Sequence, residues 1–451
     1  MSRLIQDWQP ENPEFWQSGG RKTARRNLWI SIPALMLAFA VWQVWSVAVI
    51  HLPRIGFNYS PNQLFWLAAV PALSGATFRA FYSFMVPVFG GRRWTAFSTA
   101  SLLLPAVGLG MAIQNPDTSY GTMLLLALLC GLGGANFSSS MANISFFFPK
   151  AEKGTAMGLN AGLGNLGVSV AQFVVPLVIT AGLFGALGGG AQTWTEGGAS
   201  KQIWLQNAGF VWVPFIIASS LAAWFGMNDL ASAKAGFAEQ AVIFKRKHNW
   251  IMCFIYLGTF GSFLGFSAGF PLLIQTAFPA VNPVKYAFLG PLIGALTRPF
   301  GGWIADKTGS GAMIAAVFGV LSFLPSETQS GSFWGFFACF MILFALSGIG
   351  NGSTFMQIPV IFLTLHQRRA EQGLSDGKQA LADAAKEGAA VAGFTGAFAA
   401  YGGFFIPKSY GTSIALTGSV NGALYGFILF YLCCLLLNWW YYARRNAEVR
   451  C

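Results

Sequence analysis

Long apolar stretches alternate with short polar ones along nearly the whole chain of 451 residues. A helix needs about 20 apolar residues to cross the roughly 30 Å hydrocarbon layer of a bilayer, and most of the stretches approach or exceed that length. The pattern therefore predicts an all-α membrane protein with twelve transmembrane helices. The expected helices are 28–50, 64–90, 94–113, 120–148, 154–184, 208–227, 250–278, 284–304, 312–324 (the weakest), 331–365, 389–410 and 422–442.

Composition and charge narrow the class of protein. Hydrophobic residues make up 55% of the chain and charged residues 9%, whereas an ordinary soluble domain carries about 25% charged residues, so a soluble globule is excluded. The net charge of +12 does not indicate nucleic-acid binding, because most basic residues lie in short loops between apolar stretches. Twenty-one of the 27 Lys and Arg fall on the side of the N-terminus, which predicts that both termini are cytoplasmic. The opposite side carries Arg54, Lys201, Lys285 and Lys408.

A polar, basic stretch divides the twelve helices into six and six. We expect an N-terminal bundle at 28–227, a linker at 228–248 and a C-terminal bundle at 249–443, with cytoplasmic ends at 1–27 and 444–451. The polar first 27 residues do not read as a cleaved signal peptide. Parallel repeats of six helices are the architecture of the major facilitator superfamily. The Ala-rich, charged stretch at 366–388 is expected to form a short cytoplasmic helix, either as a solvated linker or as a regulatory contact.

Two arginines lie deep inside expected helices. Arg79 and Arg298 each fall in the second helix of their half, and each is followed about 50 residues later by a Gly-X-Gly sequence. An arginine at mid-membrane costs at least about 2.5 kcal/mol and usually faces a cavity on a transport path. All fifteen acidic residues fall in loops, tails or, for Asp306, at a helix end. Two guanidiniums without a carboxylate in reach predict an anion site, and their planar donor geometry favours a small flat oxyanion.

Runs of small residues contain further candidates for the transport path. The runs 131–143, 158–169 and 348–354 are rich in glycine, which lets helix backbones approach closely or lets them bend; we keep both interpretations. The gating candidates are Gly164, Gly167, Gly348 and Gly350, and the candidates for lining the anion site are Asn165, Tyr256, Phe137 and Phe355.

Several longer motifs resemble the nitrate/nitrite porters of the major facilitator superfamily, and most closely the bacterial respiratory nitrate/nitrite antiporters. The matching segments are RNLWIS from Arg26, YSFMVPVFGGRRWTAFST from Tyr82, ANFSSSMANISFFFPKAEKGTAMGLNAGLGNLGVSV from Ala135, WFGMNDLA from Trp224, FGSFLGFSAGF from Phe260, GIGNGSTF from Gly348 and GGFFIPK from Gly402. The resemblance implies that the two arginines hold nitrate or nitrite, that Asn165 and Tyr256 add hydrogen bonds, and that Phe137 and Phe355 pack on the faces of the anion.

The chain departs from the family pattern at three places. Phe81 stands where the family commonly has a proline, Pro299 follows the second arginine, and Gly396 stands where a serine is usual. These departures bear on local helix shape and on the relative affinities for nitrate and nitrite, and leave the class unchanged.

The transport mechanism is predicted from the side chains that could carry a proton. A proton-coupled carrier generally uses a buried carboxylate or histidine in its pathway, whereas His51, His248 and His366 all lie at helix ends. We therefore expect exchange of nitrate for nitrite by alternating access in the bacterial inner membrane, with proton symport as the alternative and a channel as a further one. No catalytic motif, cofactor site or metal-binding cysteine pair is present in the sequence. We expect a monomeric transporter whose partners are the two anions and the lipid bilayer, and neither an enzyme nor a sensor.

Overall fold

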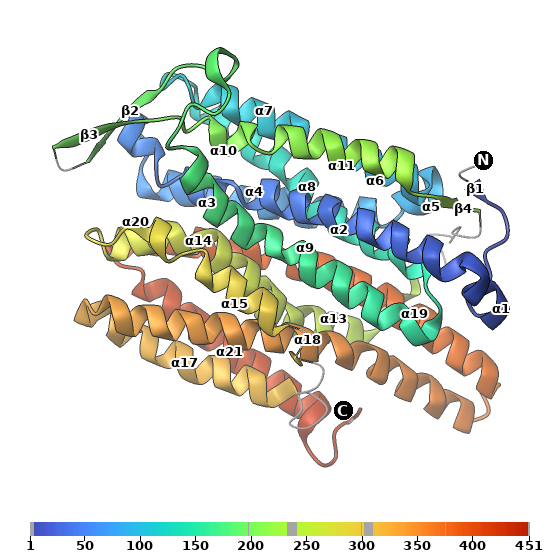
Figure 1. The fold of residues 1–451 in the computed structure, drawn as a ribbon. Helices are drawn as coiled ribbons and strands as arrows, with labels where there is room; N and C mark the ends of the chain where they lie inside the picture. The colour runs from blue at the N-terminus through green and yellow to red at the C-terminus, as the bar shows by residue number, and fades with distance from the viewer. Residues whose placement is uncertain are drawn as a thin grey trace.

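The computed structural model describes residues 4–196, 198–231, 241–298, 300–301, 310–374 and 376–449. Long helices lie side by side in one bundle (Figure 1). The helices of the first part are α1 (Pro13–Phe15), η1 (Trp16–Gly20), α2 (Arg21–Gln43), α3 (Trp45–Ala48), η2 (Leu52–Ile55), α4 (Pro61–Tyr82), α5 (Met85–Phe89), α6 (Gly91–Ala100), α7 (Leu103–Ala112), α8 (Tyr120–Phe147), α9 (Lys150–Val178), η3 (Gly185–Gly188), α10 (Asn207–Phe210) and α11 (Val213–Gly226). After the gap at 232–240 come η4 (Ala241–Lys245), α13 (Lys247–Tyr256), η5 (Leu257–Gly261), α14 (Ser262–Ala277), η6 (Pro283–Lys285), α15 (Leu289–Thr297), α17 (Ser310–Ser330), α18 (Phe333–Glu371), α19 (Gly377–Ala399), α20 (Gly402–Thr417), α21 (Asn421–Asn438) and η7 (Trp439–Ala443).

Ten helices within the described residues are long and apolar enough to cross a membrane. They coincide with ten of the twelve expected spans. The other two expected spans correspond to α15, which is followed closely by residues outside the described part, and to α17, of which the described residues include the apolar helical stretch Ile314–Thr328. The weakest expected span, 312–324, thus lies within a helix of the structure.

The helix ends differ from expectation in two places. The first long helix begins at Arg21 rather than at residue 28, and the preceding segment contributes β1 (Leu4–Ile5), which pairs in parallel with β4 (Asp229–Leu230). The stretch 366–388 does not form a separate short helix. Its Ala-rich sequence favours helix, and α18 and α19 extend through it from either side, so only a turn remains near Gly373.

The helix extensions near this turn are held by ion pairs. Glu387 of α19 accepts a hydrogen bond of 3.1 Å from Nη2 of Arg246, which precedes α13, and its other carboxylate oxygen contacts Nε of the same arginine. His366 of α18 lies 2.6 Å from the Glu387 carboxylate. These contacts join the segment after the gap to both extended helices. Residues 232–240 of the expected linker lie outside the described residues, and so do Asp306 and Lys307.

A β-hairpin that the hydrophobic pattern does not reveal connects α9 to α10. Its strands β2 (Gln192–Glu196) and β3 (Ala199–Ile203) pair antiparallel. The turn contains Gly198, whose φ of 84° is a backbone conformation that glycine adopts readily. The hairpin projects from the end of the bundle opposite the N-terminus (Figure 1); we call this end the hairpin end and the other the N-terminal end.

Helices from before and after the gap pack against each other along α4 and α20. The Trp66 and Phe404 ring centroids are 5.5 Å apart, and the hydroxyls of Thr77 and Tyr401 are hydrogen-bonded at 2.9 Å. A second seam is made by the later part of α9, where Gln172 donates to the Ser267 carbonyl at 2.7 Å. The core is therefore continuous between the two sequence halves.

Candidate functional site

Arg79 lies near the end of α4 and is completely buried. Its Nε donates to the carbonyl of Gly134 in α8 at 2.9 Å, and its Nη1 donates to the carbonyl of Gly396 in α19 at 2.7 Å. The third nitrogen, Nη2, is buried and has no hydrogen-bond partner among the described residues. A buried charged donor without a partner is costly, so this nitrogen is positioned to donate to a ligand.

Three aromatic rings surround the Arg79 guanidinium. Its Cζ lies 4.8 Å from the ring centroid of Phe137, 5.2 Å from Trp42 and 5.4 Å from Phe260. The indole of Trp42 is fixed by a 2.7 Å hydrogen bond from its Nε1 to the Pro71 carbonyl. Cations are attracted to the faces of aromatic rings, so the rings stabilise a charge that would otherwise be poorly solvated.

Arg298 directly follows α15 and is half-buried. Its Cζ lies 5.8 Å from the ring centroid of Phe260. Its Nη1 is buried without a hydrogen-bond partner in the part of the chain that the structure describes. Phe260 therefore contacts both guanidiniums, and the two arginines that the sequence singles out meet at one ring.

The ion pairs found within the described residues all involve other groups, so neither Arg79 nor Arg298 has a carboxylate among the described residues within 4.0 Å. That the two cations have no counter-ion stays a prediction. Asp306 lies outside the described residues, as does Pro299.

The aromatic row continues from Phe260 to the other two candidates in this half. The ring of Tyr256 stacks on Phe260 at 5.5 Å, and Phe355 lies 6.0 Å from Tyr256. The Tyr256 hydroxyl donates to Oδ1 of Asn351, a buried residue of α18, at 2.5 Å. On the other side, Phe137 lies 6.2 Å from Phe260. The structure thus brings Phe137, Tyr256 and Phe355 together with both arginines.

Asn165 is buried in α9, and neither atom of its side-chain amide has a partner among the described residues. Among the described residues, no hydrogen bond joins it to either guanidinium. An unsatisfied buried amide costs about 1–3 kcal/mol per group. Asn165 therefore remains a candidate for hydrogen bonding to a ligand.

The proposed gating glycines lie at close helix contacts. A Cβ at Gly164 would lie 2.7 Å from the Leu35 side chain, one at Gly167 would collide with the Met36 carbonyl, and one at Gly348 would collide with the Gly294 carbonyl. These observations support the packing interpretation for the three positions. Gly350 is buried in α18, and a bending role stays a prediction for all four.

Replacement of Gly167 by alanine should destabilise the protein. The Cβ would press on backbone that cannot rotate away, and overpacking of this kind costs about 1–3 kcal/mol. Gly158, on the same helix, has nothing within 4 Å of an added methyl group, so Gly158→Ala should be neutral or stabilising by up to about 1 kcal/mol. Thermal unfolding of the two variants in detergent tests this; equal midpoints would contradict it.

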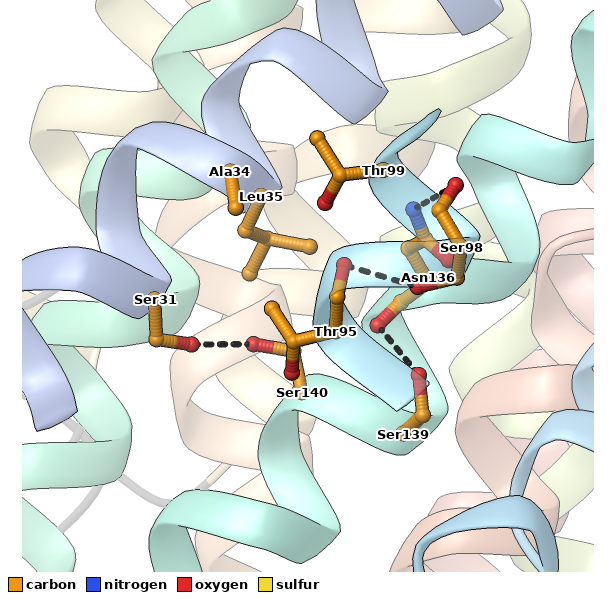
Figure 2. Close-up of a pocket in the computed structure, with 9 residues that line it drawn as sticks. All are labelled: Ser31, Ala34, Leu35, Thr95, Ser98, Thr99, Asn136, Ser139 and Ser140. Atoms are coloured by element: carbon orange, nitrogen blue, oxygen red, sulfur yellow. Dashed lines mark hydrogen bonds between the residues drawn. The ribbon is translucent and has the colours of Figure 1, made fainter. Parts of the chain in front are cut away.

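A small polar cavity adjoins the first glycine-rich run but lies apart from the arginines. It has a volume of about 10 Å³, which is room for one water molecule. Figure 2 shows hydroxyl groups turned toward it, with Ser31 and Ser140 hydrogen-bonded at 2.8 Å and the Asn136 amide donating to the Ser98 carbonyl at 3.3 Å. We interpret it as a polar seam that fixes α2, α6 and α8 together.

Sequence reasoning missed five residues of the site. They are Phe260, Trp42 and Asn351, which contribute side chains, and Gly134 and Gly396, which contribute backbone carbonyls. Phe260 lies four residues after Tyr256, a spacing that puts both side chains on one helix face, and this could have revealed it. The carbonyl partners come from two distant helices, and nothing in the sequence marks them.

Comparison with known proteins gives a consistent picture. Residues 23–407 match the Major Facilitator Superfamily. The chain is 50% identical over 450 residues to the nitrate/nitrite transporter NarU of Escherichia coli strain K12, covering 98% of this chain and 97% of that protein. It is 43% identical over 460 residues to the probable nitrate/nitrite antiporter NarK2 of Thermus thermophilus, covering 99% and 98%. Among solved structures, the xylose transporter XylE from E. coli superimposes with a TM-score of 0.63 at 11% identity, covering 92% of this chain and 99% of that one.

Proposed function

This chain belongs to the nitrate/nitrite porters of the major facilitator superfamily, and we propose that it exchanges external nitrate for internal nitrite across the bacterial inner membrane. The observation that carries the proposal is the pair of guanidiniums at Phe260. Arg79 Nη2 and Arg298 Nη1 are buried donors without a partner among the described residues, and two such donors suit one small planar oxyanion.

The neighbouring groups fit the same ligand. The rings of Phe137, Phe260 and Phe355 exclude water, and charge interactions strengthen where water is excluded. The amide of Asn165 and the hydroxyl of Tyr256 add hydrogen-bond capacity, and Tyr256 is positioned by its hydrogen bond to Asn351. Arg79 is already oriented by its two carbonyl bonds, so little ordering would accompany binding.

The packing of α9 suggests at which end the site is closed. In its later part, Ser169 donates to the Phe288 carbonyl at 2.9 Å and Gln172 to the Ser267 carbonyl. We infer a state closed at the hairpin end, which is the side opposite the cytoplasm if the basic loops orient the protein as expected.

Exchange follows from the charge of the site. Two guanidiniums in a poorly screened cavity repel each other when the halves close around an empty site. One bound anion reduces the net charge of the pair from +2 to +1. A loaded carrier should therefore change conformation faster than an empty one, so that outward and inward steps each require an anion.

Reconstitution into liposomes tests the exchange. Vesicles are loaded with nitrite, with neither anion, or with a pH gradient alone, and uptake of labelled nitrate is followed. Uptake should require internal nitrite and should not respond to the pH gradient. Robust uptake into empty vesicles driven by protons would contradict exchange and would support the symport alternative, while single-channel conductance would support a channel.

Gly396→Ser should be well tolerated. The backbone carbonyl of Gly396 contacts Arg79, and a Cβ there would meet only Phe137, at 4.0 Å. The hydroxyl has room to reach the anion without moving either group. We expect transport rates within about threefold of the unmodified protein, since the net contribution of one neutral hydrogen bond is only about 1 kcal/mol; a complete loss would contradict this placement.

A further inference from the structure

The hydroxyl of Tyr256 is already in use within the protein. It donates its proton to Oδ1 of Asn351 in α18 at 2.5 Å. Both residues are buried, each with 1% of its surface exposed. A phenol carries a single proton and can otherwise only accept hydrogen bonds. In this arrangement Tyr256 therefore has no proton left for an anion.

Tyr256 nevertheless lies in the aromatic row that joins the two guanidiniums. Its ring stacks on Phe260 with 5.5 Å between the centroids, and Phe260 contacts both Arg79 and Arg298. An acceptor near two cations stabilises them while the site is empty, whereas an oxyanion in the site requires donors. The hydroxyl therefore has to present opposite polarities to the empty and the occupied site.

The side chain of Asn351 has the groups that such a reversal requires. Its amide oxygen accepts and its amide nitrogen donates, and rotation about the last side-chain bond exchanges their positions. Among the described residues, Nδ2 donates to no other group, so the rotation breaks no second hydrogen bond. With Nδ2 turned toward Tyr256, the phenol oxygen accepts and the phenol proton becomes available to a ligand.

We propose that Asn351 sets the direction of the Tyr256 hydroxyl and that its amide rotates when nitrate or nitrite binds. In the empty site Tyr256 donates to Oδ1. In the occupied site Nδ2 donates to the phenol oxygen and the phenol donates to the anion. The bond within the pair is kept with its polarity reversed, and a charge-assisted hydrogen bond, roughly twice as strong as a neutral one, is added. Asn351 is thus a positioning residue that acts through Tyr256, and this role rests on the proposed function.

Asn351→Asp tests the direction of the hydroxyl. A carboxylate can only accept, so it should hold the Tyr256 proton permanently. We expect the Kd for nitrate, measured by isothermal titration calorimetry in detergent, to rise at least about 100-fold, of which about tenfold is the loss of Tyr256 as a donor to the anion. The remainder comes from the new negative charge.

A Tyr256→Phe background separates these two causes. The phenol donor is already absent there, so Asn351→Asp should raise the Kd about tenfold less than it does in the unmodified protein. Equal increases in the two backgrounds would mean that only charge or packing is at work, and they overturn the proposal.

Asn351→Leu keeps the proposal testable if the aspartate variant does not fold. Leucine has a similar volume and neither donates nor accepts, so Tyr256 keeps its proton and loses only the donor that orients it. The Kd should rise about threefold, with the maximal exchange rate unchanged, and the rise should vanish in the Tyr256→Phe background. A rise of the same size in both backgrounds contradicts the positioning role.

Ser262→Ala is the matched control for the loss of a phenol's partner. Ser262 Oγ accepts from the buried hydroxyl of Tyr431 at 2.6 Å, outside the aromatic row. We expect this variant to lower the thermal unfolding midpoint and to leave the Kd for nitrate within about twofold of the unmodified protein. An effect on the Kd as large as that of Asn351→Leu would assign both to packing and would overturn the proposal.

Infrared difference spectroscopy follows the rotation in the protein with Asn351 intact. Spectra with and without nitrate are compared for protein that carries ¹³C-labelled tyrosine, and the Tyr256 band is assigned by its absence in Tyr256→Phe. The phenol C–O stretch depends on whether the hydroxyl donates, accepts or does both. Nitrate should shift the band from that of a donor to that of a group that both donates and accepts. An unshifted band in a protein that binds nitrate overturns the proposal.

The same measurements separate this inference from the proposed function. If the unmodified protein binds nitrate and the two backgrounds give equal increases in Kd, the twin-arginine site stands and Asn351 has no positioning role. If the backgrounds differ as expected and liposomes show no exchange, the exchange mechanism fails and the positioning role stands. If the unmodified protein binds neither anion, both proposals are overturned.

Discussion

Arg79→Lys and Arg298→Lys are each expected to lower nitrate exchange at least about 100-fold, because an ammonium replaces a planar donor that pairs bidentately with an oxyanion. Arg79 uses separate nitrogens for Gly134, for Gly396 and for the free donor position. A lysine has one nitrogen and cannot reach both carbonyls while donating to an anion. A loss of about 3 kcal/mol of binding corresponds to a factor of about 100.

The control for this prediction is Arg93→Lys. Arg93 is 61% exposed and lies 3.9 Å from Asp229, a geometry in which an ion pair contributes little. The same substitution there should leave exchange unchanged. Measuring labelled nitrate uptake into nitrite-loaded liposomes, together with the amount of folded protein recovered, distinguishes loss of transport from loss of folding. Retention of more than a tenth of the rate in both arginine variants would contradict the twin-arginine site.

Phe260→Leu should reduce exchange about tenfold to 100-fold. The ring of Phe260 contacts both guanidiniums, at 5.4 Å and 5.8 Å from their Cζ atoms, and it stacks on Tyr256. A cation–π contact contributes about 0.5–2 kcal/mol, so the loss of two such contacts is large enough to account for a decrease of this size. Leucine retains apolar volume and removes the ring.

Two variants make the Phe260 result specific. Phe260→Trp keeps an aromatic face and should retain more exchange than Phe260→Leu. Phe263→Leu, a buried position three residues along the chain without a cation nearby in the described contacts, should affect stability more than exchange. If Phe260→Leu and Phe263→Leu reduced exchange equally, packing alone would explain the loss.

The membrane spans and the two deeply placed arginines could be predicted from local sequence. Apolar length predicts ten of the spans, and the placement of Arg79 and Arg298 without acidic neighbours indicates an anion site. Phe260 and the carbonyl of Gly396 enter the site through tertiary contacts between distant helices, which one sequence does not encode in any local pattern. The Ala-rich stretch 366–388 was expected to be helical, but its division between α18 and α19 was not predicted. The Arg246–Glu387–His366 cluster that joins the two helix extensions is again a tertiary contact.

The pairing of β1 with β4 gives the connector between the two halves a fixed starting point. Ala231 donates its backbone N–H to the Ile5 carbonyl at 3.0 Å, and on the far side Arg246 is anchored to Glu387. The fifteen peptide units from Ala231 to Arg246 span at most about 50 Å when fully extended. The connector therefore limits how far these two points can separate. A larger separation during rocking would require β1 to dissociate from β4 or the Arg246–Glu387 pair to break.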